Sequence, residues 1–120
     1  MGIQLTVSPS SWIDEGKDEV LDFAFHAEKI QQIKSSAFNK GNTYIMHFGQ
    51  QHIAFLIEQD KFSNRLDISS DEVSIAVDAL NISIADSYIS FSVNVSRFDA
   101  SEFIAELKKL VYECDFYNEL

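Results

Sequence analysis

Two of the three histidines are the residues best suited to chemistry in this chain, because their spacing lets them meet. His47 and His52 stand on either side of Gly49-Gln50, a pair that favours a two-residue hairpin turn with glycine in its first central position. Such a turn places the two imidazoles opposite each other, close enough to share a metal ion. A closed zinc site needs four ligands, however, and no cysteine or further histidine is placed to complete one. We therefore expect no metal and no cofactor, and we expect His26 at the surface or at its boundary.

Nucleophilic catalysis finds no support in the sequence either. Cys114 falls on the apolar stripe of a predicted helix, where a buried thiol is inert. The serines follow strand alternation or turns, and none stands in the Gly-x-Ser-x-Gly pattern of a nucleophile elbow. There is no glycine-rich phosphate-binding loop, and the paired carboxylates are neighbours in sequence, whereas general acid–base catalysis needs carboxylates that converge in a cleft. The sequence therefore predicts no catalytic residues and a protein that is not an enzyme.

The acidic residues gather in three clusters, and two of these clusters include aromatic residues. Carboxylates steer and orient a basic partner, while aromatic side chains supply buried area at the centre of an interface. The alternative interpretation is that the aromatics belong to the core and that the acids form a solvated rim. On the first interpretation, the candidate partner-binding residues are Trp12, Asp14, Glu15, Asp18, Glu19, Asp67, Asp71, Glu72, Tyr112, Asp115 and Tyr117.

The charge of the chain is unevenly distributed. The 120 residues have a formal net charge of −10, and residues 67–120 contain eleven acids but only three bases. A surface of this sign repels nucleic acid and anionic membranes and attracts basic proteins. We expect a basic protein partner, with no direct contact to nucleic acid or membrane, although an acidic surface can also serve solubility alone. One cysteine allows no intrachain disulfide, and the N-terminus lacks the features of a signal peptide, so we expect a cytoplasmic location.

The C-terminal half of the chain has the clearest periodicity. Apolar and polar residues alternate over 89–96 and again over 80–84, which predicts an antiparallel hairpin. A further alternating run over 73–77 is out of phase with 80–84, so a bulge or turn is expected near Asp78-Ala79. The apolar spacing then becomes helical from Asp99, which with Glu102 resembles a capping box. We expect a helix whose core-facing residues are Phe103, Leu107, Leu110, Val111 and Cys114.

The remaining segments complete a predicted α+β fold. The turn at Gly49-Gln50 predicts a hairpin that pairs Tyr44 with Phe55 and Met46 with Ile53, and residues 62–71 are expected to form a connecting loop. Residues 18–38 fit both a strand and a helix, and their composition favours the helix. Residues 3–7 form a short first strand. The expected architecture is one domain over residues 1–120, with an antiparallel sheet of about five strands, an N-terminal helix and the C-terminal helix.

The stretch from Ile89 to Leu110, ISFSVNVSRFDASEFIAELKKL, is similar in pattern to the closing strand and helix of several bacterial immunity proteins from polymorphic-toxin and contact-dependent inhibition systems. The resemblance covers 22 residues and carries over no functional residue. It implies a small, acidic, cytoplasmic protein that binds and neutralises a cognate basic toxin, such as a nuclease, in a stoichiometric complex. Three alternatives stay open: an acidic nucleic-acid mimic that inhibits a host defence complex, a small secretion chaperone, and a small metal-dependent enzyme.

Overall fold

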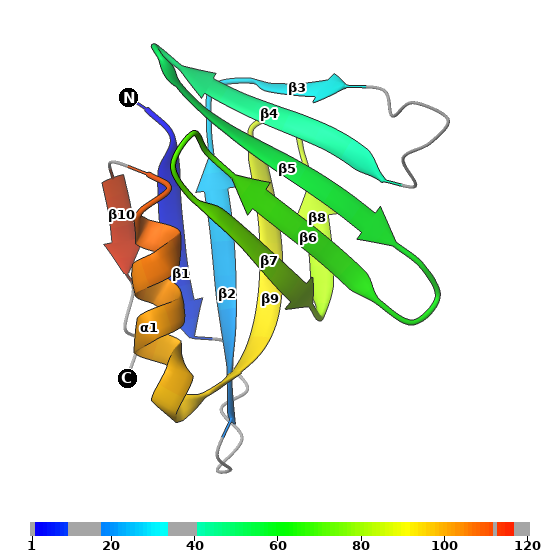
Figure 1. Cartoon of the computed structure of the whole chain (residues 1–120), viewed down its shortest axis with the longest axis vertical. Helices are drawn as coiled ribbons and strands as arrows, with labels where there is room; N and C mark the ends of the chain where they lie inside the picture. The colour runs from blue at the N-terminus through cyan, green and yellow to red at the C-terminus, as the bar shows by residue number, and fades with distance from the viewer. Residues whose placement is uncertain (1, 10–17, 34–40, 112, 117–120) are drawn as a thin grey trace.

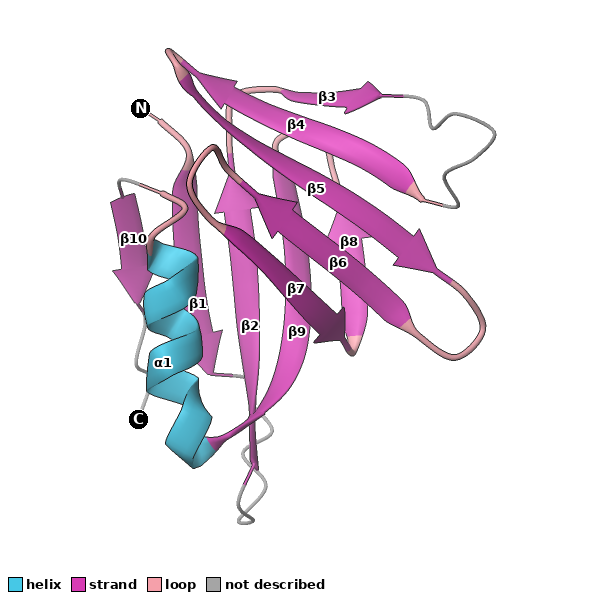
Figure 2. Ribbon diagram, in the orientation of Figure 1, coloured by secondary structure: helices cyan, strands magenta, loops and turns pink. Residues whose placement is uncertain are grey.

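Two β-sheets and a helix make up the part of the chain that the computed structural model describes, residues 2–9, 18–33, 41–111 and 113–116 (Figures 1 and 2). Sheet A has the order β10-β1-β2-β9-β8, and sheet B has the order β3-β4-β5-β6-β7. All neighbouring strands are antiparallel except β1 and β10. The strands of sheet A are β1 (Gln4–Pro9), β2 (Asp18–His26), β8 (Asn81–Ile84), β9 (Tyr88–Ser96) and β10 (Glu113–Phe116). Those of sheet B are β3 (Ile30–Ile33), β4 (Asn42–Phe48), β5 (Gln51–Gln59), β6 (Asn64–Ser69) and β7 (Ser74–Ala79).

The α+β class is confirmed in this coarse form, but the expected architecture was wrong in detail. About five strands in one sheet were predicted, whereas the described residues form two sheets of five strands each. Sheet B is a meander of consecutive hairpins. Sheet A is assembled from three separate stretches of the chain, because the strands of sheet B lie between β2 and β8, and α1 lies between β9 and β10.

The two sheets and the helix form two layers around one core. Sheet A is one layer, and sheet B together with α1 (Arg97–Lys108) forms the other. Phe25 in β2 meets Phe55 in β5 with ring centroids 5.1 Å apart, which joins the two sheets. Phe23, on the same face of β2, meets Phe103 of α1 at 5.4 Å. Sheet B and α1 therefore cover the same face of sheet A, which we call its inner face.

Strand alternation explains which residues fill this core. Leu21, Phe23, Phe25 and Ala27 are buried on β2, and Phe91 of β9 stacks on Phe23 with centroids 5.2 Å apart. The neighbouring strands β1 and β9 bury their own alternate apolar residues against the same layer. Every fully buried residue in the described part of the chain is apolar. Burial of large apolar side chains stabilises a fold by roughly 1.5–3 kcal/mol each, so these rows hold the two layers together.

The helix predicted over residues 18–38 was wrong for the described part of that segment. Residues 18–26 form β2 and residues 30–33 form β3, while residues 34–38 lie outside the described residues. Helix propensity differs by only tenths of a kcal/mol between most residues, which is less than the gain from burying one phenylalanine. The strand form buries both Phe23 and Phe25 between matching rows of β1 and β9. Tertiary burial therefore decided the structure of this segment.

The loop predicted over residues 62–71 was also wrong. Residues 64–69 form β6, in which Leu66 and Ile68 are buried while Arg65 and Asp67 face the other way. The phase change predicted near Asp78-Ala79 has a simple cause, because at Leu80 the chain passes from sheet B to sheet A. The Leu80 amide there donates to the Ser92 carbonyl oxygen at 2.7 Å.

The predicted β4–β5 hairpin is confirmed residue by residue, including the pairing of Tyr44 with Phe55. Gly49 has a φ of 60°, in the left-handed region that a tight hairpin turn favours at this position. The hairpin predicted from residues 80–84 and 89–96 is confirmed as well, as the antiparallel pair of β8 and β9.

The C-terminal helix is confirmed, but its start and end differ from the prediction. Its N-cap is Ser96, whose Oγ accepts a hydrogen bond from the Asp99 amide at 3.2 Å, so the cap lies three residues earlier than expected. Leu107, Leu110 and Val111 are buried, and Phe103 packs against the core. Cys114 was expected on the helix, but the helix ends at Lys108 and Cys114 lies in β10, paired with Leu5.

Candidate partner-binding surface

The outer face of sheet B, which points away from sheet A, has an apolar centre. Paired residues on neighbouring strands point to the same side of a sheet, and alternate residues point to opposite sides. Because Phe55 and Leu66 are buried on the inner side, Ala54 and Leu56 must lie on the outer side. Ile45 pairs with Ala54, and Ala76 lies in the same row as Leu56. Ile45, Ala54 and Leu56 are half-buried and Ala76 is exposed, so the centre of this face is accessible.

Carboxylates border this apolar centre on the side of the β5–β6 turn, which is its lower end in Figure 1. Across β5, β6 and β7, Asp67 lies between its paired residues Leu56 and Ala76. Two residues further along these strands, Arg65 lies between its paired residues Glu58 and Asp78. Arg65 Nε is 3.6 Å from Asp67 Oδ2, so the basic residue among them is engaged by one of the acids. The group formed by these four residues has a net negative charge.

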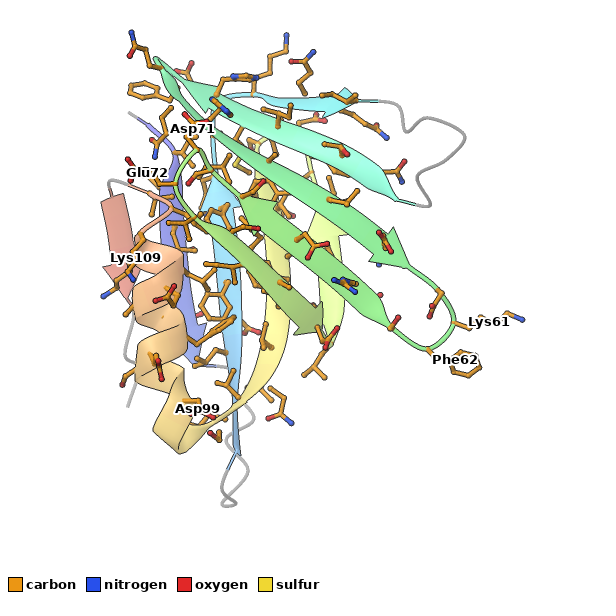
Figure 3. The ribbon with its side chains drawn as sticks, in the orientation of Figure 1. Lys61, Phe62, Asp71, Glu72, Asp99 and Lys109 are labelled. Atoms are coloured by element: carbon orange, nitrogen blue, oxygen red, sulfur yellow. The ribbon has the colours of Figure 1, made fainter. Side chains whose placement is uncertain are left out.

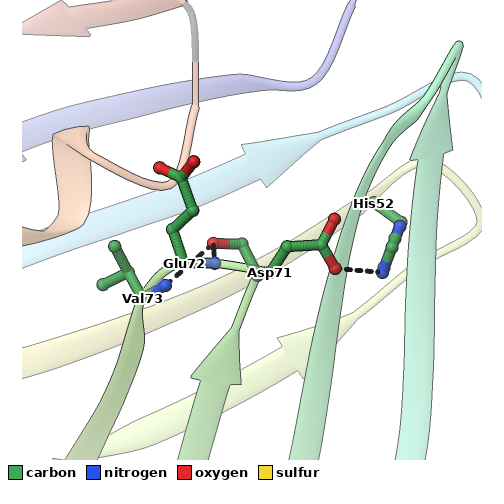
Figure 4. A network of polar contacts seen from close by, with 5 residues as sticks. His52, Asp71, Glu72 and Val73 are labelled. Atoms are coloured by element: carbon green, nitrogen blue, oxygen red, sulfur yellow. Dashed lines mark hydrogen bonds and ion pairs between the residues drawn. The ribbon is translucent and has the colours of Figure 1, made fainter.

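At the opposite, upper end of the face, the predicted histidine pair lies beside the β6–β7 turn, which contains Asp71 and Glu72. The rings of His47 and His52 lie opposite each other with centroids 6.1 Å apart. His52 Nε2 is 3.2 Å from Asp71 Oδ1, as Figure 4 shows. Ser70 shapes the turn, because its Oγ accepts hydrogen bonds from the amides of Glu72 and Val73 at 3.4 and 3.3 Å. The turn therefore presents Asp71 and Glu72 as exposed neighbours whose carboxylates point in different directions.

A cleft of about 170 Å³ lies where three elements converge: the β4–β5 turn, the β6–β7 turn and the end of α1. Gln51 holds this junction together, because its Nε2 donates to the Leu110 carbonyl oxygen at 3.0 Å. The Oε1 atom of the same side chain is buried without a hydrogen-bond partner among the described residues. The polar side chains that line the cleft are Gln50, Gln51, His52, Ser70, Asp71, Glu72 and Lys109.

The β5–β6 turn presents an aromatic ring to solvent. Phe62 is 95% exposed, and Figure 3 shows it pointing away from the molecule beside Lys61. Asp60 fixes this turn, because its Oδ1 accepts hydrogen bonds from the amides of Phe62 and Ser63, each at 2.7 Å. These hydrogen bonds lower the pKa of the Asp60 carboxyl, since they stabilise its charged form. The Asp60 carboxylate therefore helps to close this turn, together with the hydrogen bond that the Asp60 amide donates to the Ser63 carbonyl oxygen at 3.0 Å.

Of the predicted partner-binding residues, Asp71 and Glu72 are neighbours in the β6–β7 turn, whereas Asp67 lies apart from them on β6, between Leu56 and Ala76. Glu19 is separate from them: it lies on β2, in the alternation of Leu21 and Phe23, and is half-buried. For Asp18 and Asp115 only the backbone is described, in β2 and β10. The other predicted residues lie outside the described residues: Trp12, Asp14, Glu15, Tyr112 and Tyr117.

Sequence reasoning missed several residues of this surface. Glu58 and Asp78 were not candidates, because their location on either side of Arg65 depends on the register of three strands. Phe62, in the β5–β6 turn, was not a candidate either. An Asp-x-x-Ser segment, such as Asp60 to Ser63, is typical of a turn that an aspartate side chain closes by accepting backbone hydrogen bonds. This pattern could have indicated the exposed turn that contains Phe62. Gln51 had no such signal, because its partner Leu110 is 59 residues away in the chain.

The histidines form no larger cluster in the described part of the chain. No group of three or more histidine, cysteine or acidic side chains is arranged there to hold a metal ion. His26 lies on the outer face of sheet A, half-buried, with its Nε2 3.4 Å from Thr6 Oγ1 and its ring 6.1 Å from that of Tyr88.

Comparison with protein-family models, with curated proteins and with solved structures gives no match to this chain. Among the described residues, the α1 helix is too short and too polar to cross a membrane.

Proposed function

We propose that this protein is a stoichiometric inhibitor of the immunity-protein type, which binds a basic protein partner through the outer face of sheet B. The observation that carries the proposal is the arrangement of that face, in which Ile45, Ala54 and Leu56 form an apolar centre with carboxylates at both ends. An apolar centre with a charged rim is the usual anatomy of a protein interface. The rim sets the sign of the partner, and here it selects a basic one.

The outer face of sheet A is a poorer candidate for the same role. Its residues include Ser83, Ser90 and Ser92, of which Ser90 and Ser92 alternate with the buried apolar residues of β9. One carboxylate on this face, that of Asp22, accepts a hydrogen bond of 2.6 Å from the Ser92 hydroxyl. Small hydroxyl side chains supply little apolar area for an interface, and a carboxylate already engaged within the fold is less available to a partner. The outer face of sheet A therefore presents serine hydroxyls where the outer face of sheet B presents Ile45, Ala54 and Leu56.

The partner class that fits best is a toxin that acts on nucleic acid. A nuclease must present a basic surface to the phosphates of its substrate. An acidic face can cover that surface and exclude the substrate, and long-range attraction raises the rate of association. Inhibition of this kind is stoichiometric and requires no catalytic group on the inhibitor.

The test begins with two charge variants that serve as matched baits in the native host. Asp67→Asn with Asp78→Asn removes two carboxylates from the proposed face. Glu28→Gln with Asp86→Asn removes the same charge from exposed positions in other turns. The partner is the protein that the wild type and the second variant retain and that the first variant loses.

The captured partner is then purified and studied quantitatively. We expect it to be basic, to lose its activity at one equivalent of inhibitor, and to associate more slowly as salt rises, because charge attraction is screened over about 8 Å at physiological ionic strength. Leu56→Ala should instead raise the dissociation rate, since apolar centres act mainly on residence time. An acidic partner, on-rates indifferent to salt, or full activity in excess inhibitor would refute the proposal.

A further inference from the structure

The edge strand β8 has one side of its backbone open. Among the described strands, β8 is the last of sheet A and pairs only with β9. Just beyond its end, the Ala85 amide donates to the Tyr88 carbonyl oxygen at 2.9 Å. Because hydrogen-bonded pairs alternate along an antiparallel ladder, Ser83 directs its backbone groups toward β9, whereas Ile82 and Ile84 direct theirs to the open side. In the described part of the chain, the amides and carbonyls of these two isoleucines therefore face no partner strand.

The side chains of the same two residues add an apolar strip to this edge. Ile82 and Ile84 pair with buried residues of β9, so both lie on the inner face of sheet A. Ile84 is nonetheless 40% exposed, and Ile82 is only partly buried. Ser83 points to the outer face between them. A strand added beside β8 would therefore meet aliphatic side chains on its inner side and a hydroxyl on its outer side.

The β8 edge is also distinguished by its lack of charge. Natural sheet edges are commonly protected from further pairing by charged side chains. Such residues stand in or directly beside the other edge strands: Glu113 and Asp115 in β10, Asp78 in β7 and Lys29 before β3. Residues 79–85, which include β8, contain none. This edge therefore lacks the charged side chains that would exclude a further strand.

We propose that β8 receives an extended segment of a partner protein, which adds to sheet A as an antiparallel strand through the backbone groups of Ile82 and Ile84. The segment that fits is uncharged, with aliphatic residues opposite the two isoleucines and a small polar residue opposite Ser83. Main-chain hydrogen bonds supply affinity in recognition of this kind, and alternate side chains supply specificity. The antiparallel direction is the more stable one per residue. The inference goes beyond the proposed function, because β8 belongs to sheet A whereas the proposed interface lies on sheet B.

A second copy of this chain is a poorer occupant of the same edge. Antiparallel pairing of two β8 strands would place the second sheet B on the same side of the extended sheet A as the first. On that side, the ends of β5 and β6 that the β5–β6 turn joins extend sideways past β8 in Figure 1, so the two copies of sheet B would compete for one space. Each chain also has a formal net charge of −10, which opposes association of two copies. The edge therefore suits a single strand better than a whole second sheet.

The first test measures amide hydrogen exchange in the protein alone. The Ile82 and Ile84 amides should exchange with solvent at least about tenfold faster than the Ser83 amide, which the ladder with β9 protects. Equal protection of the three amides would show that the edge is already covered, and it would overturn the inference.

The second test uses the peptide acetyl-Ser-Val-Ser-Val-Ser-amide and two N-methylated derivatives. In the proposed alignment the valine amides donate to β8 and the serine amides point away from it. N-methylation of both valines should therefore weaken binding at least about tenfold, because two hydrogen bonds are lost, whereas N-methylation of two serines adds the same groups on the far side and should preserve binding. The parent peptide should give saturable NMR shifts at the Ile82 and Ile84 amides and slow their exchange.

Two variants of the protein locate the peptide on this edge. Ile84→Pro removes one outward amide but no hydrogen bond of the β8–β9 ladder, and it should weaken binding of the parent peptide at least about fivefold. Ile84→Thr is the matched control, because it keeps the amide and the branched shape, and it should change the affinity less than about threefold. The peptide comparison uses the wild-type protein and does not depend on the folding of either variant.

Three results would overturn the inference. The first is the absence of saturable shifts at the edge, and the second is binding of the valine-methylated peptide as tight as that of the serine-methylated one. The third is a dimer in analytical ultracentrifugation that Ile84→Pro dissociates, which would assign the edge to a second copy. None of these measurements uses the basic partner, so their outcome is independent of the proposed function.

Discussion

Phe25 of β2 and Phe55 of β5 meet edge to face across the two layers, with ring centroids 5.1 Å apart and an interplanar angle of 72°. Both rings are fully buried, and they connect sheet A to sheet B between strands that share no hydrogen bonds, near the end of β2 and at the middle of β5. Phe25 also lies 6.2 Å from Phe91, so the contact belongs to a continuous row of aromatic rings. The two sheets are therefore held together at this point by side-chain packing and not by backbone hydrogen bonds.

Truncation of Phe55 to alanine should lower the free energy of unfolding by about 3–5 kcal/mol, because the change leaves a cavity in a fully packed layer. Urea denaturation measures the loss. Phe62→Ala is the matched control, since that ring is 95% exposed and its removal should change stability by less than about 0.5 kcal/mol. Equal effects of the two substitutions would show that the sheets are not joined at Phe55.

The sequence allowed some of these elements to be predicted and concealed others. The β4–β5 register followed from Gly49, because one residue type at one position determined where the hairpin turns. The β2 strand could not be assigned, since its apolar residues satisfy both a helical and a strand period. The matching rows of β1 and β9, which arrive from opposite ends of the chain, decide between them.

The candidate site was predictable only in part, for a related reason. Asp71 and Glu72 are adjacent in sequence, so their shared location in one turn follows from almost any local structure. The cleft joins Gln51 to Leu110 across 59 residues, and no local pattern contains that information. Charge composition led to the prediction of a basic partner, whereas the surface that we propose for it depends on strand pairing.

Ser96 should be the residue on which the start of α1 depends. Ser96→Ala removes the hydroxyl that accepts from the Asp99 amide and donates to the Asp99 carboxylate at 2.8 Å. Loss of an N-cap of this kind costs about 0.5–2 kcal/mol, measurable by thermal or urea unfolding. Ser101→Ala makes the same chemical change on the exposed surface of the same helix and should leave stability within about 0.5 kcal/mol of the wild type. A loss at Ser101 as large as that at Ser96 would contradict the capping role.

The β5–β6 turn should respond to acid through Asp60. The amides of Phe62 and Ser63 hold the pKa of this carboxyl below the ordinary aspartate range. Because the pKa is lowered in the folded state, the carboxylate stabilises the turn above the ordinary aspartate pKa and loses this effect as pH falls through the lowered pKa. NMR titration of the Phe62 and Ser63 amides should give a midpoint below about 3.9, and Asp60→Asn should abolish the transition. A midpoint at or above that value would contradict the hydrogen-bonded turn.

We expect the paired histidines to hold no tightly bound transition metal. His47 and His52 face each other, but Asp71 approaches only His52, and the described residues offer no group of three or more suitable side chains. Elemental analysis after dialysis against zinc, nickel or copper should find less than one equivalent. A stoichiometric metal that disappears in the His47→Ala/His52→Ala double variant would overturn this expectation and support a metal-dependent activity.

The position of β1 between β2 and β10 has a consequence for synthesis on the ribosome. Residues 4–7 pair with residues 113–116, so this part of sheet A stays open until nearly the whole described chain has emerged. The five strands of sheet B pair only with their sequence neighbours and can assemble earlier through short loop closures. Until β10 arrives, one edge of β1 remains without its partner strand, and exposed strand edges promote association between chains. The nascent chain should therefore be most prone to aggregate just before residues 113–116 are released.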